Sequence, residues 1–427
     1  MNFDRSNSQL VDALNVIPIG SQTFSKSYYS LPQGVSPLFL QSGCGSQVTD
    51  IDGNNYTDFV NSLLAISLGY CDPDVDAAVT KQLVHGVSFS LPHPMETELA
   101  QLLVKHIPCA EKVRFGKNGT DATSAAIRLA RAFTGREHIA VCGYHGWQDW
   151  YIGSTTRNLG VPAAVSALTH PFSFNQFEQV KQIFDEVNGE LAAIILEPMN
   201  IAYPEPGFLE QLRVFCDENN IVLIFDETIT GFRFDLGGAQ RLFGVTPDLA
   251  TFGKGMANGF PISAIVGKDS IMAKMEDIFF SGTFGGETLS ITAAIATIKK
   301  MEQQNAPEKI AELGSFLIDQ VSQLITELEL EQYIAISGHP SWSFLHFHNG
   351  TNYDATQLKS LFIQKMVENG FLIMGSHNLS LSHSKEDIER LISCYRKVLP
   401  ELKNVDETMM FEQAFKGELI KAVFKVR

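Results

Sequence analysis

The stretch that decides the fold is IVLIFDETITGFRFDLGGAQRLFGVTPDLATFGKGM, residues 221–256. It opens with five apolar residues, and a run of this length and β-branched content suits a strand buried on both faces of a parallel sheet. Asp226 and Glu227 follow directly. Since ligands of open α/β sheets bind at the carboxyl ends of the strands, we expect these carboxylates at a binding site.

A second apolar run, residues 249–252, leads into a single lysine, Lys254, between two glycines. A carboxylate at one strand end and a lysine just past another can bracket a flat, anionic ring that contains nitrogen. Pyridoxal phosphate needs such a pair: a lysine for a Schiff base and an aspartate for its pyridinium nitrogen. Taken singly, each feature has a plainer interpretation. An Asp-Glu pair after a strand more often caps a helix or binds a metal, and a lone lysine is usually solvated.

Composition restricts the class of protein. The chain has 427 residues, of which 44% are hydrophobic and 19% charged, which favours a globular protein with more than one domain. A net charge of -16 and the lack of a basic run exclude a nucleic-acid partner. No apolar stretch is long enough for a membrane span, and the N-terminus does not resemble a signal peptide. The six cysteines show no metal spacing, so we expect reduced thiols, no metal site and a cytoplasmic location.

A phosphate cradle is predicted near residue 119. A strand over residues 112–115 is followed by a glycine-containing loop and by a helix that Asp121 is expected to cap. Gly119 and Thr120 then stand where free N–H groups and the helix dipole point at one spot. Such loops also occur simply because tight turns need glycine, so this signal needs support from elsewhere.

Two further strands are expected to end at the same edge of the sheet. The strand over 138–142 runs into GYHGWQDW, in which Tyr144 and His145 could contact a flat cofactor while the tryptophans belong to the core or a subunit interface. The strand over 191–196 ends in Glu197, and the helix over 207–219 returns the chain to the opening stretch. This alternation is typical of right-handed parallel crossovers.

Three domains are predicted along the chain. Residues 1–60 form an arm, with a short leading helix and a β-hairpin that turns at Asp52–Asn55. Residues 61–310 form a large α/β domain that binds the cofactor. After Pro307 the sequence pattern changes to a long helix followed by short strands and further helices. Residues 311–427 are therefore expected to form a smaller α+β domain.

Six motifs occur in order: NGTDA (118–122), GYHG (143–146), LEP (196–198), FDETITGFR (225–233), TFGKGMANGFP (251–261) and SGTFGGETL (281–289). With them the sequence resembles the class III pyridoxal-phosphate aminotransferases over nearly its whole length. The resemblance implies PLP fold type I, with a mostly parallel seven-stranded sheet in the large domain. It also implies a homodimer whose two subunits share their active sites.

The resemblance assigns roles to individual residues. Lys254 would form the Schiff base and afterwards shuttle the substrate proton, while Asp226 would keep the ring nitrogen protonated. Glu197 would lie on the substrate side, paired with Arg233 or with the ring hydroxyl. The residues implied to bind pyridoxal 5'-phosphate are Asn118, Gly119, Thr120, Tyr144, His145, Asp226, Thr228, Lys254 and, from the second subunit, Thr283.

Two branches of the family are similar to this sequence. Glutamate-1-semialdehyde 2,1-aminomutases share LIFDETITGFR, but they usually carry an arginine-containing NSPVR-type segment where this chain has GSQTFSKSYYS. Aminotransferases of bacterial surface-polysaccharide sugars, such as 8-amino-3,8-dideoxyoctulosonate transaminase, resemble the GSQTFSK, GYHGWQDW and TFGGETL segments. We therefore expect amino transfer from L-glutamate to a keto-sugar by a ping-pong reaction through pyridoxamine 5'-phosphate, with the mutase as the alternative.

Motif position indicates polar contacts to the substrate from Ser25, Lys26, Asn61, Gln148 and Glu287. A hypothesis of another class is a protein that binds pyridoxal phosphate without turnover. The presence of both Lys254 and Asp226 argues against it, because neither residue is needed to hold a fold.

Overall fold

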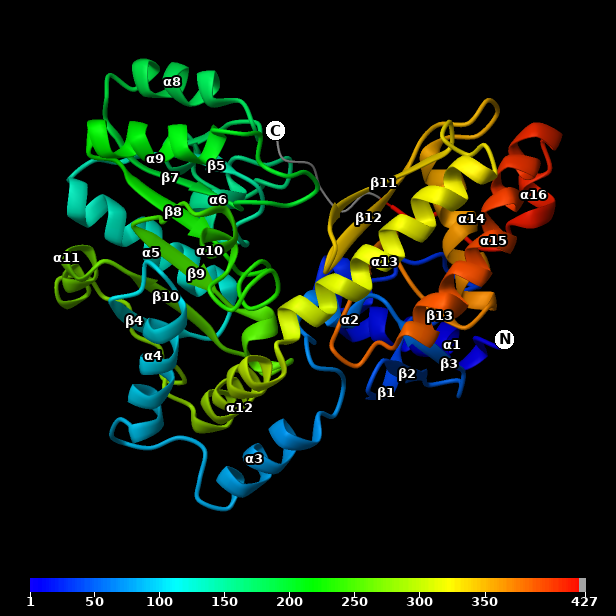
Figure 1. Cartoon of the computed structure of the whole chain (residues 1–427), viewed down its shortest axis with the longest axis horizontal. Helices are drawn as coiled ribbons and strands as arrows, with labels where there is room; N and C mark the ends of the chain where they lie inside the picture. Colours follow the sequence, from blue (N-terminus) through cyan, green and yellow to red (C-terminus); the bar gives the residue numbers. More distant parts are fainter. Residues whose placement is uncertain (422–427) are drawn as a thin grey trace. The chain divides into compact units, whose positions relative to one another are not determined.

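The computed structural model describes residues 1–421, and these form two compact units (Figure 1). Unit 1 comprises residues 1–72 and 309–421, and unit 2 comprises residues 73–308. The second junction lies within helix α13 (Ala306–Glu327). The predicted division into three domains at residues 60 and 310 stays a prediction, and residues 422–427 of its third domain lie outside the described part of the chain.

Unit 2 contains a seven-stranded sheet in the order β4-β10-β9-β8-β7-β5-β6. The strands are β4 (Lys112–Gly116), β5 (His138–Cys142), β6 (Thr169–Pro171), β7 (Leu191–Leu196), β8 (Val222–Asp226), β9 (Leu249–Phe252) and β10 (Ser263–Gly267). β10 is antiparallel to β4 and β9, and the other pairs are parallel. All residues of β7 and β8 are buried, as their continuous apolar runs predict. The mostly parallel α/β sheet is therefore confirmed.

Unit 2 also contains helices. They are α3 (Pro73–Leu83), α4 (Pro94–His106), α5 (Gly119–Thr134), α6 (Asp149–Ile152), α7 (Ala163–Ser166), α8 (Phe177–Glu186), α9 (Phe208–Asn219), α10 (Ala239–Phe243), α11 (Asp269–Met272) and α12 (Thr288–Gln304), with 3-10 helices η3 (Lys254–Ala257) and η4 (Ala273–Glu276). α5 packs against β4 and β7–β10. Its alanines are small enough to bring the helix close to the sheet, in one core cluster with Ile139, Ile195 and Ile224.

The start of α5 differs from the prediction. We expected Asp121 to cap the helix, but the helix begins at Gly119 and Asn118 is its N-cap. Asp121 lies in the first turn, where its Oδ2 accepts the backbone N–H groups of Lys117 (2.9 Å) and Asn118 (2.8 Å). The reason is that a first-turn carboxylate can reach back to the N-cap backbone, so the helix starts three residues earlier than predicted. Gly119 and Thr120 thus belong to the first turn itself.

Unit 1 contains two smaller sheets. The first has the order β1 (Leu40–Cys44), β2 (Gln47–Asp50), β3 (Asn55–Asp58) and β13 (Phe371–Leu372), and the second the order β11 (Ile334–His339), β12 (Trp342–Phe347) and β14 (Ser376–Asn378). β2 and β3 are antiparallel, which confirms the predicted hairpin. β13 pairs in parallel with β3, so the N-terminal hairpin and a strand near the C-terminus share one sheet.

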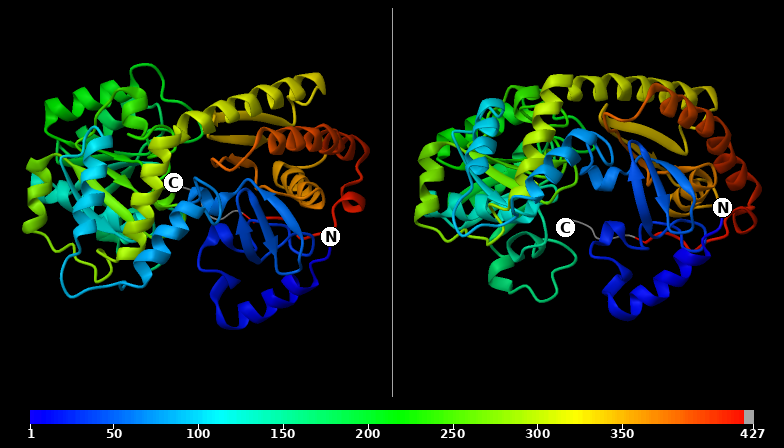
Figure 2. Two further views of the ribbon diagram at one scale, coloured as in Figure 1. Left: turned by 60° about the horizontal axis from the view of Figure 1, so that its bottom comes forward. Right: turned by 90° about the horizontal axis from the view of Figure 1, so that it is seen from below.

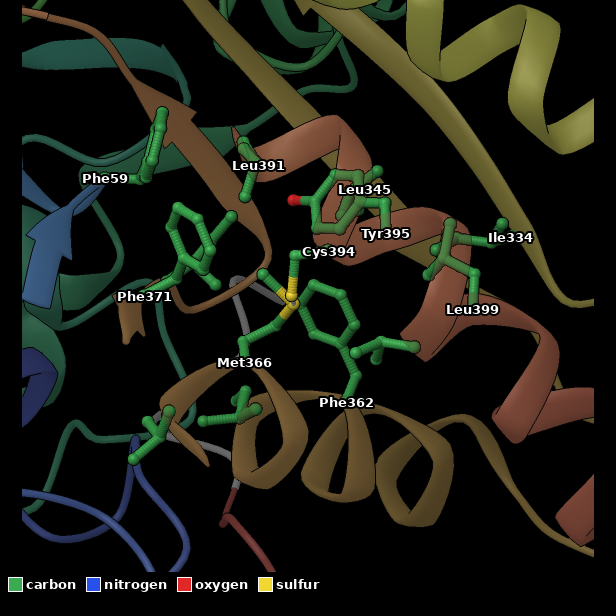
Figure 3. Packing of buried hydrophobic residues seen from close by; sticks show 14 of the residues in the cluster. Phe59, Ile334, Leu345, Phe362, Met366, Phe371, Leu391, Cys394, Tyr395 and Leu399 are labelled. Carbon is green, nitrogen blue, oxygen red and sulfur yellow. Dashed lines mark hydrogen bonds between the residues drawn. The ribbon is translucent and has the colours of Figure 1, made fainter. Parts of the chain in front are cut away.

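The helices of unit 1 are α1 (Asp4–Val16), η1 (Pro18–Gly20), η2 (Phe24–Lys26), α2 (Asn61–Leu64), α13, α14 (Ala355–Glu368), α15 (Lys385–Thr408) and α16 (Phe411–Ala414). Figure 2 shows α13, α14 and α15 beside β11 and β12 in two further views. Apolar residues of these elements form one core, in which the sulfur atoms of Met366 and Cys394 lie 3.7 Å apart (Figure 3). Among residues 1–421, none of the helices combines the length and apolar composition that crossing a membrane requires.

Candidate active site

The candidate active site lies at the carboxyl edge of the seven-stranded sheet. β5, β7, β8 and β9 are neighbours there, and the ladders pair Cys142 with Leu196, Leu196 with Phe225 and Asp226 with Thr251. Residues at or just beyond these strand ends are therefore brought to one edge. They include the predicted residues Tyr144, His145, Glu197, Asp226 and Lys254.

Asp226 ends β8 and is buried. Its Oδ1 accepts hydrogen bonds from Thr228 Oγ1 (2.6 Å), Thr228 N (3.1 Å) and Thr251 Oγ1 (3.0 Å), and its Oδ2 lies 2.8 Å from His145 Nδ1. Burial raises the pKa of Asp226, but the hydrogen bond and charge of His145 and the bonds from Thr228 outweigh it, so the pKa is lowered. The site therefore holds a buried, ionised carboxylate.

His145 is fixed from several sides. Its Nε2 lies 3.0 Å from the Cys142 carbonyl oxygen and its Nδ1 faces Asp226, so a ring that carries both protons satisfies both acceptors. Trp150 stacks nearly parallel to the ring at 6.4 Å between centroids, and Tyr151 meets it edge-on at 5.3 Å. Trp150 itself is buried in the core, as expected for that tryptophan. His145 is thus held in place to hydrogen-bond to Asp226.

Lys254 begins η3 just after β9 and has a φ of 42°, a left-handed conformation that costs of order 1–3 kcal/mol for a residue with a side chain. Burial lowers the pKa of Lys254, the charges of Glu197 and Asp226 raise it, and Arg233 lowers it, with a net lowering. Arg233 is itself buried, and burial lowers its pKa to about 10. The surroundings of Lys254 therefore favour the neutral form of its amine.

Glu197 follows β7 and is buried. Its Oε2 accepts the backbone N–H of Tyr144 (3.1 Å) and the Asn200 side-chain amide (2.9 Å). Burial and the charge of Asp226 raise the pKa of Glu197. Gly143, with a φ of 100°, lies against this carboxylate, and a Cβ there would collide with it. A glycine is therefore required for the loop to pass over Glu197.

The first turn of α5 lies where the phosphate cradle is predicted. Thr120 Oγ1 is buried and has no hydrogen-bond partner within residues 1–421. Gly146 of the aromatic loop lies against Thr120 at a φ of 104°, and Gly119 lies against Thr228, so both glycines permit close backbone approach. A buried hydroxyl without a partner at the N-terminus of a 16-residue helix fits a phosphate.

Glu227, next to Asp226, has a structural role. It is fully buried, and its carboxylate accepts the backbone N–H groups of Ala239 (2.6 Å) and Gln240 (3.0 Å), the Thr230 hydroxyl (2.5 Å) and the Gln240 side-chain amide (3.2 Å). Burial raises the pKa of Glu227. One carboxylate therefore holds together the loop over residues 227–240, which also carries Arg233.

Replacing Glu227 by glutamine tests this role. The new NH₂ group must face a backbone N–H whichever way the amide turns, so we expect a destabilisation of about 1–3 kcal/mol, seen as a lower thermal midpoint. Glu218→Gln, on the exposed side of α9, is the matched control and should melt like the wild type. Equal midpoints for the two variants would refute the structural role of Glu227.

The other predicted residues of unit 2 lie in loops. Thr283 is exposed, Gln148 precedes α6, and Glu287 is the N-cap of α12, where its side chain accepts the N–H groups of Leu289 and Ser290. Lys117 also pairs with Glu287 at 2.9 Å. The Glu287 carboxylate is thus engaged within its own chain, and the substrate roles of Gln148 and Glu287 stay predictions.

Ser25, Lys26 and Asn61 belong to unit 1. Ser25 and Lys26 are exposed in η2, and Lys26 Nζ donates to Ser62 Oγ at 3.1 Å. Asn61 is buried, and its side-chain amide bonds to the Asn378 carbonyl oxygen. Their contacts to substrate stay predictions.

Sequence reasoning missed Thr251 and Asn200, which bond to the two carboxylates. The pairing of β8 with β9 places Thr251 directly beside Asp226, and this register could have been anticipated from two strands that end together. Asn200 follows Glu197 by three residues in a loop without a repeating pattern, so no signal pointed to it.

The residues fit pyridoxal phosphate. The helix N-terminus with the Thr120 hydroxyl suits its phosphate, the ionised Asp226 suits a protonated ring nitrogen, and the Lys254 amine suits its aldehyde. Together with the sheet, this site defines an enzyme of PLP fold type I.

The model of the class III aminotransferases matches residues 28–397, and the chain belongs to this family. It is 34% identical over 415 residues to the 3-aminobutyryl-CoA aminotransferase of Cloacimonas acidaminovorans, with 95% of this chain and 99% of that protein covered. It is also 34% identical over 422 residues to a glutamate-1-semialdehyde 2,1-aminomutase of Brevibacillus brevis, with 92% and 97% covered.

The fold of this chain is similar to that of solved transaminase structures. A transaminase with PLP bound has a TM-score of 0.87 and 27% identity, covering 95% of this chain and all of that one. An omega-transaminase from Sphaerobacter thermophilus has a TM-score of 0.84 and 28% identity, covering 94% of this chain and all of that one. The protein is a class III aminotransferase that uses pyridoxal phosphate, as the sequence predicted.

Proposed function

We propose that the enzyme transfers an amino group from L-glutamate to a keto-sugar, with 8-oxo-3,8-dideoxyoctulosonate as the candidate acceptor in bacterial surface-polysaccharide synthesis. The segments at 20–26, 143–150 and 283–289 support this choice, since they resemble the sugar branch of the family. A CoA-thioester aminotransferase and an aminomutase are equally similar relatives, so overall identity favours neither of their reactions.

The observation that carries the proposal is the chemistry around Lys26. Its amine bonds to Ser62 Oγ, and no carboxylate pairs with it within residues 1–421. Ser62 belongs to the turn Asn61–Leu64, in which four successive residues have a φ between 46° and 71°. Strain of this kind is concentrated at functional sites. A cation beside a hydroxyl group suits an acceptor that carries a carboxylate and several hydroxyls.

The residues of unit 2 divide the chemistry among them. Bound pyridoxal phosphate supplies an aldehyde that takes the amino group and a ring that withdraws electrons from the substrate Cα. Lys254 moves the proton at that carbon, because its lowered pKa leaves more neutral amine at neutral pH. Asp226 holds a proton on the ring nitrogen, and His145 and Thr228 position Asp226.

The remaining residues bind and orient. Gly119 and Thr120, with Asn118 at the helix cap, hold the phosphate, and Thr283 of a second subunit completes that contact. Tyr144 covers one face of the ring. Glu197, fixed by Asn200, borders the substrate side.

The experiment that tests the proposal separates the two half-reactions. The enzyme with its cofactor should form 2-oxoglutarate from glutamate and shift its visible absorption, and it should then aminate a member of a keto-sugar panel. An absorption band that responds to no amino donor would favour a binding protein without turnover. Isomerisation of glutamate-1-semialdehyde without an added donor would favour the mutase, and 3-aminobutyryl-CoA belongs in the panel as the substrate class of a relative.

Lys26→Met tests the acceptor contact. Loss of a charged hydrogen bond should raise KM for the keto-sugar about tenfold or more and leave the glutamate half-reaction unchanged. Lys26→Arg should restore part of the affinity, and Lys397→Met, at an exposed lysine of α15, should change neither constant. An unchanged acceptor KM in Lys26→Met would remove Lys26 from the site.

We also propose a homodimer. Thr288 bonds to the Val87 carbonyl oxygen through N (2.9 Å) and Oγ1 (3.0 Å), which joins the segments 83–91 and 279–288. Their exposed apolar residues are Leu83, Val84, Phe89, Leu91, Phe279 and Phe284. Such a cluster marks an interaction surface, and a second copy would cover it beside Thr283.

Phe284→Asp should therefore shift the protein from twice the chain mass to the chain mass in light scattering, and should weaken cofactor binding. Phe133→Asp, at another exposed phenylalanine, in α5, is the control and should leave the dimer intact. A wild-type protein of single-chain mass would contradict the homodimer.

A further inference from the structure

Two of the six cysteines, Cys44 and Cys71, are exposed and lie on neighbouring stretches of unit 1. Beside them, Gly45 and Tyr70 form an antiparallel bridge and exchange both backbone hydrogen bonds, of 2.8 and 2.9 Å. In an antiparallel pairing the next residues in opposite directions stand across from each other. Cys44 and Cys71 therefore adjoin this bridge on opposite stretches of the chain.

A side-chain contact confirms this proximity. Cys71 Sγ lies 3.2 Å from the Gly43 carbonyl oxygen, and that carbonyl belongs to the peptide bond that joins Gly43 to Cys44. Disulfides span Cα separations of about 4.4–6.8 Å, a range that suits residues on either side of one such bridge. Cys71, at a φ of 51°, directs its sulfur onto β1. The Cys71 thiol therefore lies beside the peptide bond that enters Cys44.

The other four cysteines are not exposed to solvent. Cys109, Cys142, Cys216 and Cys394 are buried, and burial raises the pKa of each thiol, to about 12 for Cys142 and about 11 for Cys394. Because the thiolate is the reactive form, these side chains exchange poorly with disulfides. Thiol chemistry at this protein's surface is confined to the exposed pair.

We propose that Cys44 and Cys71 are a reversible disulfide-forming site, oxidised by a small-molecule disulfide such as glutathione disulfide. One thiolate attacks the oxidant's S–S bond and releases one glutathione thiolate. The second cysteine then attacks the mixed disulfide, forms the Cys44–Cys71 bond and releases the second glutathione. The two cysteines lose two protons and two electrons in all, and one glutathione disulfide becomes two glutathione thiols.

The bond would close a covalent loop around the β2–β3 hairpin and the strained turn. Tyr70, next to Cys71, donates its hydroxyl to Asp58 Oδ2 at 2.6 Å, and Asp58 Oδ1 accepts the N–H groups of Val60 (2.7 Å) and Asn61 (3.2 Å). The disulfide would therefore lie one residue from the contacts that hold the entry to this turn. The proposal does not depend on which acceptor the enzyme uses.

The test uses the full-length enzyme with its cofactor, incubated with glutathione disulfide, quenched in acid, alkylated and digested without reduction. Two of the six thiols should be lost, a peptide pair linking Cys44 to Cys71 within one chain should appear, and dithiothreitol should restore both thiols. The buried four should remain alkylatable and serve as internal controls.

Three variants sharpen the result. Cys44→Ser and Cys71→Ser should each abolish the linked peptide. The double variant Ser42→Cys, Cys44→Ser moves the thiol along the same exposed strand but out of the opposite position, so it should link at least about tenfold more slowly. Recovery of both wild-type thiols in alkylated form, a bond between chains, a bond to a buried cysteine, or equal linking by the double variant would overturn the proposal.

Discussion

Replacing Lys254 by alanine is expected to lower kcat for amino transfer by at least about 10³-fold while the fold is retained. The reason is local: Lys254 begins η3 at the end of β9, within the field of Glu197 and Asp226, and burial lowers its pKa. A methyl group can neither bind the aldehyde of the cofactor nor move a proton. Alanine bears the same backbone strain as lysine at a φ of 42°, so the change adds no strain and should not weaken the fold by much.

Kinetics in both half-reactions, together with circular dichroism and the thermal midpoint, measure this effect. Borohydride treatment of the wild-type enzyme should attach the cofactor mass to the peptide that contains Lys254, and the variant should show no such peptide. Lys397→Ala is the control for loss of a lysine as such. Turnover within tenfold of the wild type in Lys254→Ala would exclude this lysine from the chemistry.

The core of the site could be predicted from the sequence because its parts follow buried strands directly. The apolar runs before Asp226 and Lys254 identify strands β8 and β9, and parallel neighbours end at one edge, so the two residues had to come close. Gly119 and Thr120 were predictable for the same reason, as the start of a helix after a strand. For these residues the sequence pattern of the strands and the order of the strands in the sheet predict the same position.

Other features depend on contacts that no local pattern records. The parallel pairing of β13 with β3 joins residues more than 300 positions apart. The antiparallel pairing of β10 with β9 depends on the path of the loops before and after β10. The helix start at Gly119 was mispredicted because Asp121 is a good residue both for the N-cap and for the first turn. The support of Glu197 by Asn200 depends on the path of an irregular loop.

The second large effect is expected for Asp226→Asn. This change keeps the shape of the side chain and removes the charge that faces His145. In the proposed mechanism the same charge faces the ring nitrogen of the bound cofactor. Without a buried anion the ring nitrogen loses its proton and withdraws electrons poorly, so we expect kcat to fall about 10²–10⁴-fold. The lowered pKa of Asp226 keeps the wild-type carboxylate ionised throughout the neutral range, so the difference should persist across it.

Asp248→Asn is the matched control. Asp248 is another buried carboxylate of unit 2, but its partners are Lys268 (2.6 Å) and Arg213 (3.0 Å) rather than a histidine at the strand ends. Its replacement should lower the thermal midpoint, because Lys268 loses its carboxylate partner and Arg213 keeps only Asp217 (2.6 Å). It should leave kcat unchanged below that midpoint.

His145→Gln separates positioning from chemistry. If His145 acts only through Asp226, then the double variant with Asp226→Asn should be no slower than Asp226→Asn alone. Both changes remove the same 2.8 Å contact, and its loss can slow turnover only once. His145→Gln alone should slow turnover less than Asp226→Asn and should shift the pH dependence of the bound cofactor's absorption. Additive losses in the double variant would mean that His145 acts on the reaction by itself, and full activity in Asp226→Asn would show that no buried anion is needed at the ring nitrogen.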